Sequence, residues 1–283
     1  MFSYRHAFHA GGHADMLKHL VLIELIHYLQ EKPGAITFID THAGAGIYKL
    51  QDGFSQVSKE AQLGIERLAA KVMPAFENLL QQVQFENQTE QLSIYPGSPF
   101  ILARLLRPQD RLKLFELHPK EILILQGNVA QLPNAQQIDV YTSNGFSGLK
   151  ALLPPLGRRG LILIDPAYED KNDYRLLETT LAEGLQRFAT GCFALWYPIL
   201  PRRESIALVD RLKKVLANYS RPWLQAELRV ANVPGERRLQ ASGMLIVNPP
   251  WTLKEKLALA LPELKTALAQ DSKASFHLSS AEV

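Results

Sequence analysis

Short apolar stretches recur along this 283-residue chain and alternate with longer stretches of helical periodicity. Seven short stretches are rich in β-branched and aromatic residues, as buried strands are: 36–40, 112–117, 137–142, 160–165, 192–197, 226–230 and 243–247. The helical stretches include 15–30, 99–107, 173–188, 203–218 and 252–269. Strands that alternate with helices of this length predict an α/β fold with a mostly parallel, doubly wound sheet.

The last two predicted strands differ from the others. Only residues 231–242 separate 226–230 from 243–247, and this connection has no helical pattern. Two strands joined so closely form a hairpin, so we expect the final strand to run antiparallel to its neighbours. A seven-stranded sheet with this ending resembles the Rossmann-like, class I S-adenosylmethionine-dependent methyltransferases.

Residues 53–92 do not fit the alternation. They are rich in glutamine, carry helical periodicity and lack a buried strand. We expect a small inserted helical subdomain at 53–92 and a core formed by 1–52 and 93–283. The polar tail from residue 270 onward is typical of a frayed terminus.

The composition limits the cellular setting. Cys192 is the single cysteine, which excludes internal disulfides and a cysteine zinc cluster and fits a reducing cytosol. The N-terminus has no apolar signal region, and the longest apolar runs are too short to span a membrane. We therefore expect a soluble, cytoplasmic protein. Its net charge of +3 is compatible with a nucleic-acid partner but does not indicate one.

A glycine-rich turn follows the first predicted strand, which ends in Asp40. Gly44 and Gly46 let the backbone approach a ligand closely, so Asp40 and Gly44 are candidates for cofactor binding. The turn lacks the third glycine of the usual dinucleotide fingerprint, which disfavours NAD. A glycine pair here is also common as plain structural punctuation.

Two further strand ends carry candidate cofactor contacts. Glu116 ends the second strand, beside the glycine turn in a doubly wound sheet, where a carboxylate can accept both ribose hydroxyls of a nucleoside. Asn144 and Gly145 follow the third strand and could face an adenine ring. The alternatives are a solvated acid for Glu116 and an ordinary Asn-Gly turn for Asn144.

The fourth strand ends in Asp165, Pro166, Ala167 and Tyr168. An exocyclic amine is a poor nucleophile because its lone pair is delocalised into the base. Asp165 and the Pro166 carbonyl could each accept one N–H and localise that pair, while Tyr168 stacks on the extruded base. This stretch predicts an amino-methyltransferase site.

A similar stretch, Asn-Pro-Pro-Trp at 248–251, follows the last strand. Ligands bind at the carboxyl ends of parallel strands, and the antiparallel last strand ends at the opposite edge. We therefore assign the site to Asp165 and expect Trp251 to close the core. Three arginine pairs are candidates for phosphate contacts: Arg158 with Arg159, Arg202 with Arg203, and Arg237 with Arg238.

Several blocks together resemble one bacterial family: SYRHAFHAGGHADMLKH, DTHAGAGIY, YPGSP, ELHP, RRGLILIDPAYE, FATGCFALWYP and ASGMLIVNPPW. In order and along nearly the whole chain they are similar to the 23S ribosomal RNA adenine-N6 methyltransferases called large-subunit methyltransferase J. The resemblance implies a monomeric, cytosolic enzyme with a Rossmann-like core and a helical insertion. It also implies S-adenosyl-L-methionine as cofactor, 23S ribosomal RNA as partner, and neither a metal nor a membrane.

The resemblance also implies roles for single residues. Asp165 would be the catalytic acceptor and a cofactor contact, and Tyr4 would contact the RNA base. The other implied cofactor contacts are Lys18, His19, His42, Ser98, Glu116, Asn144 and Gly145.

The chain departs from the family pattern at two positions. Ala167 replaces the second proline before the tyrosine, which predicts a somewhat looser turn. Asn144 replaces an aspartate and presents an amide where the family has a charge.

Three other functions fit parts of the sequence. His6, His9, His13 and His19 could hold a metal, although Gly11 and Gly12 interrupt a helix there. A DNA adenine methylase would use the same amine-binding motif. A non-catalytic nucleic-acid binder, linked to the use of external DNA, would not bind the cofactor.

Overall fold

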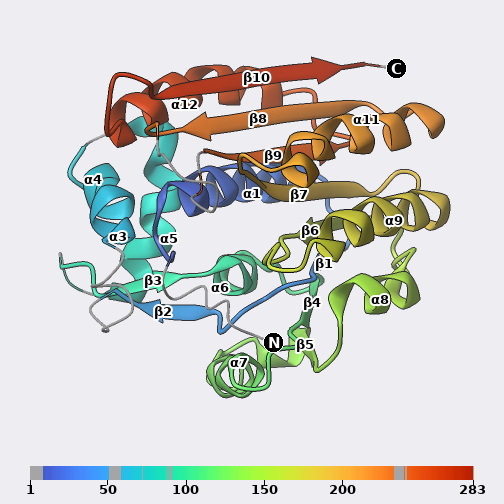
Figure 1. The fold of residues 1–283 in the computed structure, drawn as a ribbon. Helices are drawn as coiled ribbons and strands as arrows, with labels where there is room; N and C mark the ends of the chain where they lie inside the picture. Colours follow the sequence, from blue (N-terminus) through green and yellow to red (C-terminus); the bar gives the residue numbers. More distant parts are fainter. Residues whose placement is uncertain are drawn as a thin grey trace.

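A computed structural model describes residues 9–50, 59–71, 73–87, 89, 91–232, 239 and 241–282. Within these residues one eight-stranded sheet has the order β10-β8-β9-β7-β6-β1-β4-β5, running from top to bottom in Figure 1. Its strands are β1 (Thr37–Asp40), β4 (Arg111–Phe115), β5 (Ile138–Tyr141), β6 (Gly160–Ile164), β7 (Cys192–Ile199), β8 (Trp223–Arg229), β9 (Ala241–Val247) and β10 (Ser275–Ala281).

Strand direction confirms the predicted methyltransferase topology. Strands β5, β4, β1, β6 and β7 run parallel to one another. Strand β9 lies between β7 and β8 and is antiparallel to both. The carboxyl ends of five parallel strands therefore share one edge of the sheet, the edge at which ligands bind in open α/β folds.

The expectation of a frayed C-terminal tail was wrong. Residues 275–281 form β10, which pairs antiparallel with β8 from Ser275–Arg229 to Ala281–Trp223. The sequence does not predict this strand because it lies at the edge of the sheet and remains largely in contact with solvent. Such a strand needs no alternating apolar pattern. Its pairing covers the edge of β8, which would otherwise expose a row of unpaired backbone groups.

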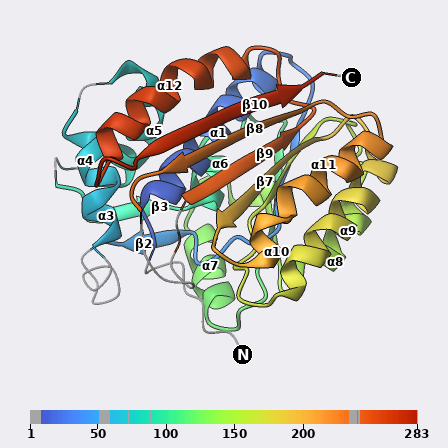
Figure 2. The ribbon, with the colours of Figure 1, turned by 45° about the horizontal axis from the view of Figure 1, so that its top comes forward.

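Helices cover both faces of the sheet (Figure 2). One face carries α1 (His13–Gln30), α6 (Ser98–Arg104), α7 (Glu121–Val129) and α12 (Leu253–Leu268), and the other carries α8 (Gly145–Leu149), α9 (Asn172–Arg187) and α11 (Leu208–Asn218). Alternate strand residues point to opposite faces. On β6, Leu161 and Leu163 join the first core and Ile162 and Ile164 join the second.

The segment after the glycine turn is helical where the structure describes it. It contains α3 (Glu60–Leu63), α4 (Ile65–Ala69), η2 (Pro74–Phe76) and α5 (Glu77–Asn87). The short strand β2 (Ile47–Lys49) precedes this segment in the sequence and β3 (Ile94–Pro96) follows it. The two strands pair antiparallel with each other. These helices contact α1 and α12. Their status as a separate subdomain stays a prediction.

The remaining short helices are η3 (Ala135–Gln137), η4 (Lys150–Leu152) and α10 (Arg203–Ile206). In the part of the chain that the structure describes, no helix combines the length and the apolar character needed to cross a bilayer.

The Asn-Pro-Pro-Trp stretch lies at the edge opposite the parallel carboxyl ends, as the topology predicts. Val247, which precedes it, pairs with Phe193 at the start of β7. The Asn248 side chain donates to the carbonyls of Ala189 and Gly191, at 2.9 and 2.7 Å, and so ties down the turn before β7. The expectation that Trp251 closes the core was wrong, because its side chain is 78% exposed.

Candidate active site

Predicted site residues from distant parts of the sequence meet at the carboxyl edge of the parallel strands. Asp40 ends β1, Glu116 directly follows β4 and Asp165 directly follows β6. Ser98 is the first residue of α6 and reaches Asp40. The parallel topology brings these groups together because each strand delivers its last residue to the same edge.

The glycine turn and Glu116 are joined directly. Gly44 has a φ of 61°, and its N–H donates to Glu116 Oε2 at 2.7 Å. The N–H of His118 donates to Glu116 Oε1 at 2.6 Å. Burial raises the pKa of Glu116, although these backbone N–H groups oppose the shift. Each oxygen keeps a lone pair, so the carboxylate can still accept hydroxyl hydrogens.

Asp40 is fully buried beneath the turn. Its Oδ2 accepts from the Ser98 hydroxyl at 2.7 Å, and its Oδ1 accepts from the His42 N–H at 3.1 Å. Burial is the largest influence and raises the pKa of Asp40 to about 6. Asp40 therefore fixes the start of the glycine turn and is itself held by α6.

Asp40→Asn is expected to flatten the pH dependence of stability between about pH 4 and 6. The folded pKa of about 6 lies above the unfolded value of 3.8, so the stabilisation is fully present below pH 3.8 and is lost as the pH rises through 6. The loss is at most about 3 kcal/mol. Denaturant unfolding from pH 4 to 8 measures it, with Asp139→Asn on the surface as control. Parallel curves for wild type and Asp40→Asn would contradict the assignment.

Lys18 links the opening helix to Asp165. Its Nζ lies 2.7 Å from Asp165 Oδ2 and 2.9 Å from Asp15 Oδ1. Burial lowers the pKa of Lys18, but the two carboxylates outweigh it and raise the pKa well above its usual value. Lys18 is therefore a buried ammonium ion, and its contact with Oδ2 leaves Oδ1 of Asp165 as an acceptor.

His42 lies half-buried above the end of β1. The Thr41 hydroxyl donates to the Leu163 carbonyl at 3.0 Å, so it accepts from His42 Nδ1 at 2.8 Å. This assigns the hydrogen to Nδ1 and leaves Nε2 as an acceptor. Burial lowers the pKa of His42 to about 3, and its ring packs edge-on against Phe146 at 4.8 Å.

Asn144 and Gly145 begin α8. The Asn144 side chain caps the helix by accepting from the Ser147 N–H at 3.2 Å, which leaves its amide N–H₂ for another partner. A Cβ on Gly145 would lie 2.0 Å from the Thr41 carbonyl oxygen. Glycine is thus required here for α8 to approach the end of β1.

His19 lies deeper than the other predicted contacts. It is fully buried, and its Nδ1 is 2.6 Å from the Tyr95 hydroxyl. The two rings are stacked, with centroids 5.5 Å apart. The structure thus places His19 beside Lys18 on α1, and its role toward a cofactor stays a prediction.

Tyr168 is close to Asp165, but its ring is enclosed. The side chain is 2% exposed, its hydroxyl donates to the Trp196 carbonyl at 2.7 Å, and its ring lies 4.8 Å from that of Tyr174. A φ of 54° turns the backbone sharply at Tyr168. Stacking on a base stays a prediction that requires the ring to be uncovered, whereas the contacts seen here hold the loop after β6.

Arg202 follows β7 and contacts this loop, although the sequence offered it only as a phosphate contact. Its Nη2 donates to the Tyr168 carbonyl at 2.9 Å and to the Tyr174 hydroxyl at 2.6 Å. The arginine therefore holds the backbone three residues beyond Asp165. Only the tertiary structure identifies this role, because no local sequence pattern around Arg202 predicts a contact with Tyr168.

The other sequence candidates fall elsewhere. Arg159 donates to the carbonyls of Leu29 and Gly34, near the amino end of β6, and so ties loops together away from the site. Tyr4, Arg237 and Arg238 lie outside the described residues. Across the described residues, no three His, Cys, Asp or Glu side chains are grouped as metal ligands.

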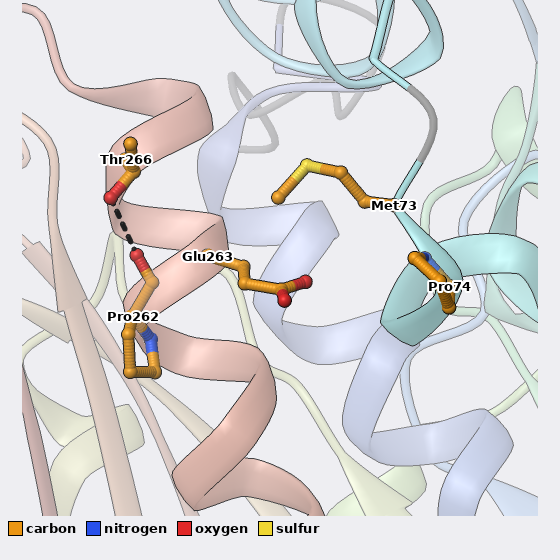
Figure 3. A pocket seen from close by; sticks show the side chains of 5 residues that line it. All are labelled: Met73, Pro74, Pro262, Glu263 and Thr266. Carbon is orange, nitrogen blue, oxygen red and sulfur yellow. Dashed lines mark hydrogen bonds between the residues drawn. The ribbon is translucent and has the colours of Figure 1, made fainter.

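An open hollow of about 310 Å³ lies apart from these residues, between α12 and the segment before η2. Figure 3 shows Met73 and Glu263 reaching into it from opposite sides. Pro74, Pro262 and Thr266 complete the lining. The Thr266 hydroxyl donates its hydrogen to the Pro262 carbonyl. With one carboxylate and no glycine turn, this hollow lacks the groups expected at a nucleoside site.

Known proteins with similar sequences cover nearly the whole chain. The family model described as Ribosomal RNA large subunit methyltransferase D, RlmJ, matches residues 33–279. A protein of Escherichia coli K12 named Ribosomal RNA large subunit methyltransferase J is 44% identical over 270 residues, or 95% of this chain and 94% of that protein. Its namesake in Haemophilus influenzae is 40% identical over 98% of this chain and 97% of its own length.

A solved structure gives the same result for the fold. Protein LPL1258 from Legionella pneumophila superposes with a TM-score of 0.87 and is 32% identical in sequence. The match covers 96% of this chain and 98% of the Legionella protein. The similarity therefore extends beyond the sheet to the helices and the insertion.

Proposed function

Since the chain belongs to the family of ribosomal RNA large subunit methyltransferases, we propose that it methylates the N6 amine of one adenine in 23S ribosomal RNA, with S-adenosyl-L-methionine as donor. Family membership makes the protein a methyltransferase. The choice of adenine N6 is a finer assignment, which rests on the geometry around Asp165. The 23S RNA and the single target rest on the sequence resemblance.

The residues at the strand ends fit the donor. The turn at Gly44 and the close approach of Gly145 to Thr41 keep side chains away from the backbone there. Glu116 is the carboxylate that would accept the ribose hydroxyls, and His42 Nε2 is a further acceptor. When bound, S-adenosyl-L-methionine would supply an electrophilic methyl group for the amine nitrogen, with the sulfur of the donor as the leaving group.

The single observation that carries the proposal is the position of Asp165 and its contact with Lys18. It stands at the end of β6, next to β1 and the glycine turn, with Oδ2 held by Lys18 at 2.7 Å. Oδ1 and the Pro166 carbonyl can each accept one amine hydrogen and direct the nitrogen lone pair away from the base. The proton that the nitrogen loses on methylation passes to Asp165 or to water.

The departure at Ala167 is compatible with this arrangement. Ala167 is exposed, so the missing proline ring removes no core contact. Tyr168 and Arg202 hold the loop from the other side. We expect Ala167→Pro to retain methyl transfer.

Methyl transfer from radiolabelled donor to protein-free 23S RNA, compared with duplex DNA, tests the proposal. We expect label in the RNA only, and mass mapping of 23S RNA from cells lacking the protein should show one adenine without its methyl group. Labelled DNA would favour a DNA adenine methylase. Absence of donor binding in calorimetry would favour a non-catalytic binder. A monomeric state and a cytoplasmic location stay predictions, the first open to light scattering.

Arg202→Gln is expected to lower kcat about tenfold, because the loop that carries Asp165 loses its anchor on the Tyr168 carbonyl. KM for the donor should change less, since Arg202 lies beside the loop and not at the glycine turn. Steady-state methyl transfer measures both constants, and thermal unfolding checks the fold. Arg203→Gln, one residue on and exposed, is the matched control. Equal kcat values for the two variants would exclude the positioning role.

A further inference from the structure

The helical segment 60–87 contacts the start of the opening helix through backbone atoms. The Ile65 N–H donates to the Gly11 carbonyl at 2.8 Å. A Cβ on Gly64 would lie 2.0 Å from that same oxygen and 2.9 Å from the Gly12 Cα. The two chain segments are therefore as close as glycine allows, and a side chain at 64 would force them apart.

A second contact reinforces this junction. His9 Nδ1 lies 2.8 Å from Glu60 Oε1, in the first turn of α3. A Cβ on Gly12 would lie 2.5 Å from Glu60 Oε2. Residues 9–12 are thus held against the inserted helices both by a hydrogen-bonded side-chain pair and by a backbone hydrogen bond.

From this junction a continuous chain of polar contacts leads to the site. The Gly11 N–H donates to Asp15 Oδ2 at 3.0 Å. Asp15 Oδ1 lies 2.9 Å from Lys18 Nζ, and Lys18 Nζ lies 2.7 Å from Asp165 Oδ2. The Asp15 and Lys18 side chains are 1% and 5% exposed, so water cannot readily replace these contacts.

We propose that the inserted helices position the Asp165 carboxylate through Gly11, Asp15 and Lys18, and that Asp15 is a positioning residue of the reaction. The inference rests on the proposed function of Asp165. Each step has one geometric cause: Gly64 and Ile65 fix the Gly11 peptide, Gly11 fixes one oxygen of Asp15, and Asp15 fixes the Lys18 ammonium.

The buried setting makes this coupling effective. A buried ammonium that loses one of its two carboxylate partners is left incompletely compensated, so its contact with the remaining carboxylate changes. Displacement of Lys18 therefore changes the direction in which Asp165 presents Oδ1. An insertion that only stabilised the fold would leave the kcat of the folded protein unchanged.

Gly64→Ala and Asp15→Asn test the coupling, with Gly127→Ala as matched control because a Cβ at 127 meets nothing within 4 Å. We expect both test variants to lower kcat about tenfold, with KM for the donor within about twofold of wild type. Amide hydrogen exchange on the protein without donor should show faster exchange at Gly11 in both. Should Gly64→Ala fail to fold, Glu60→Gln replaces it.

The double variant decides between coupling and independent damage. If Gly64 acts through Asp15, the Gly64→Ala and Asp15→Asn double variant should have the kcat of Asp15→Asn alone. Additive losses, or a folded Gly64→Ala with the kcat of Gly127→Ala, would overturn the inference. Failure of the proposed function is recognised separately, since the wild-type protein would then not methylate 23S RNA.

Discussion

Asp165→Asn is expected to lower kcat for methyl transfer about a thousandfold in a protein that remains folded. The amide has the shape of the carboxylate and can still accept from Lys18. The other end of the amide is an NH₂ group. It carries hydrogens of its own and cannot accept one from the amine of the base. The amine then loses one of the two acceptors that direct its lone pair. Single-turnover transfer to 23S RNA with saturating donor measures the effect.

Asp170→Asn is the matched control for this prediction. It lies in the same loop and is exposed, and its carboxylate accepts from the nearby Asn172 N–H at 2.8 Å. We expect nearly wild-type turnover from it. Donor affinity, measured by calorimetry, separates a loss of chemistry from a loss of binding. An Asp165→Asn variant that keeps more than about a tenth of wild-type kcat would show that another group accepts the amine hydrogens.

Gly145→Ala is expected to weaken donor binding at least tenfold and to destabilise the fold by about 1–3 kcal/mol. The added Cβ would lie 2.0 Å from the Thr41 carbonyl oxygen and 2.7 Å from its carbon, which are backbone atoms and cannot rotate away. The start of α8 must therefore move away from β1. Asn144 and Phe146 move with it, and Phe146 is the ring against which His42 packs.

Calorimetry of donor binding and denaturant unfolding measure the two effects of Gly145→Ala. Gly127→Ala, in the open on α7, controls for the general effect of a methyl group on a helix. Wild-type affinity in Gly145→Ala would show that the approach of α8 to β1 does not shape the donor site.

The central parallel strands were readily predicted from sequence because they are buried on both faces. Residues 160–164 are apolar throughout and all buried, so their pattern has one interpretation. The direction of β9 followed from the short connection to β8. The predictions for β10 and Trp251 were wrong. The pairing of β10 and the exposure of Trp251 depend on neighbouring elements, which no local sequence pattern indicates.

The grouping of the candidate site residues was predicted in part, and for a physical reason. Asp40, Glu116 and Asp165 were found because polar residues that end buried strands must meet at one edge of a parallel sheet. The contacts of Asp15 and Arg202 were not predicted. Their partners lie on other elements, such as Gly11 beside the insertion and Tyr168 after β6, and those distances depend on how helices pack.

The sequence by itself therefore determined which segments form the parallel strands and which acids end them, because burial periodicity and connection length act locally. The tertiary structure alone decided that Lys18 binds Asp165, that the Tyr168 ring is enclosed, and that the inserted helices hold Gly11. These contacts join groups that are distant in sequence. They form because the packing of helices on the sheet leaves buried charges and backbone groups only these partners.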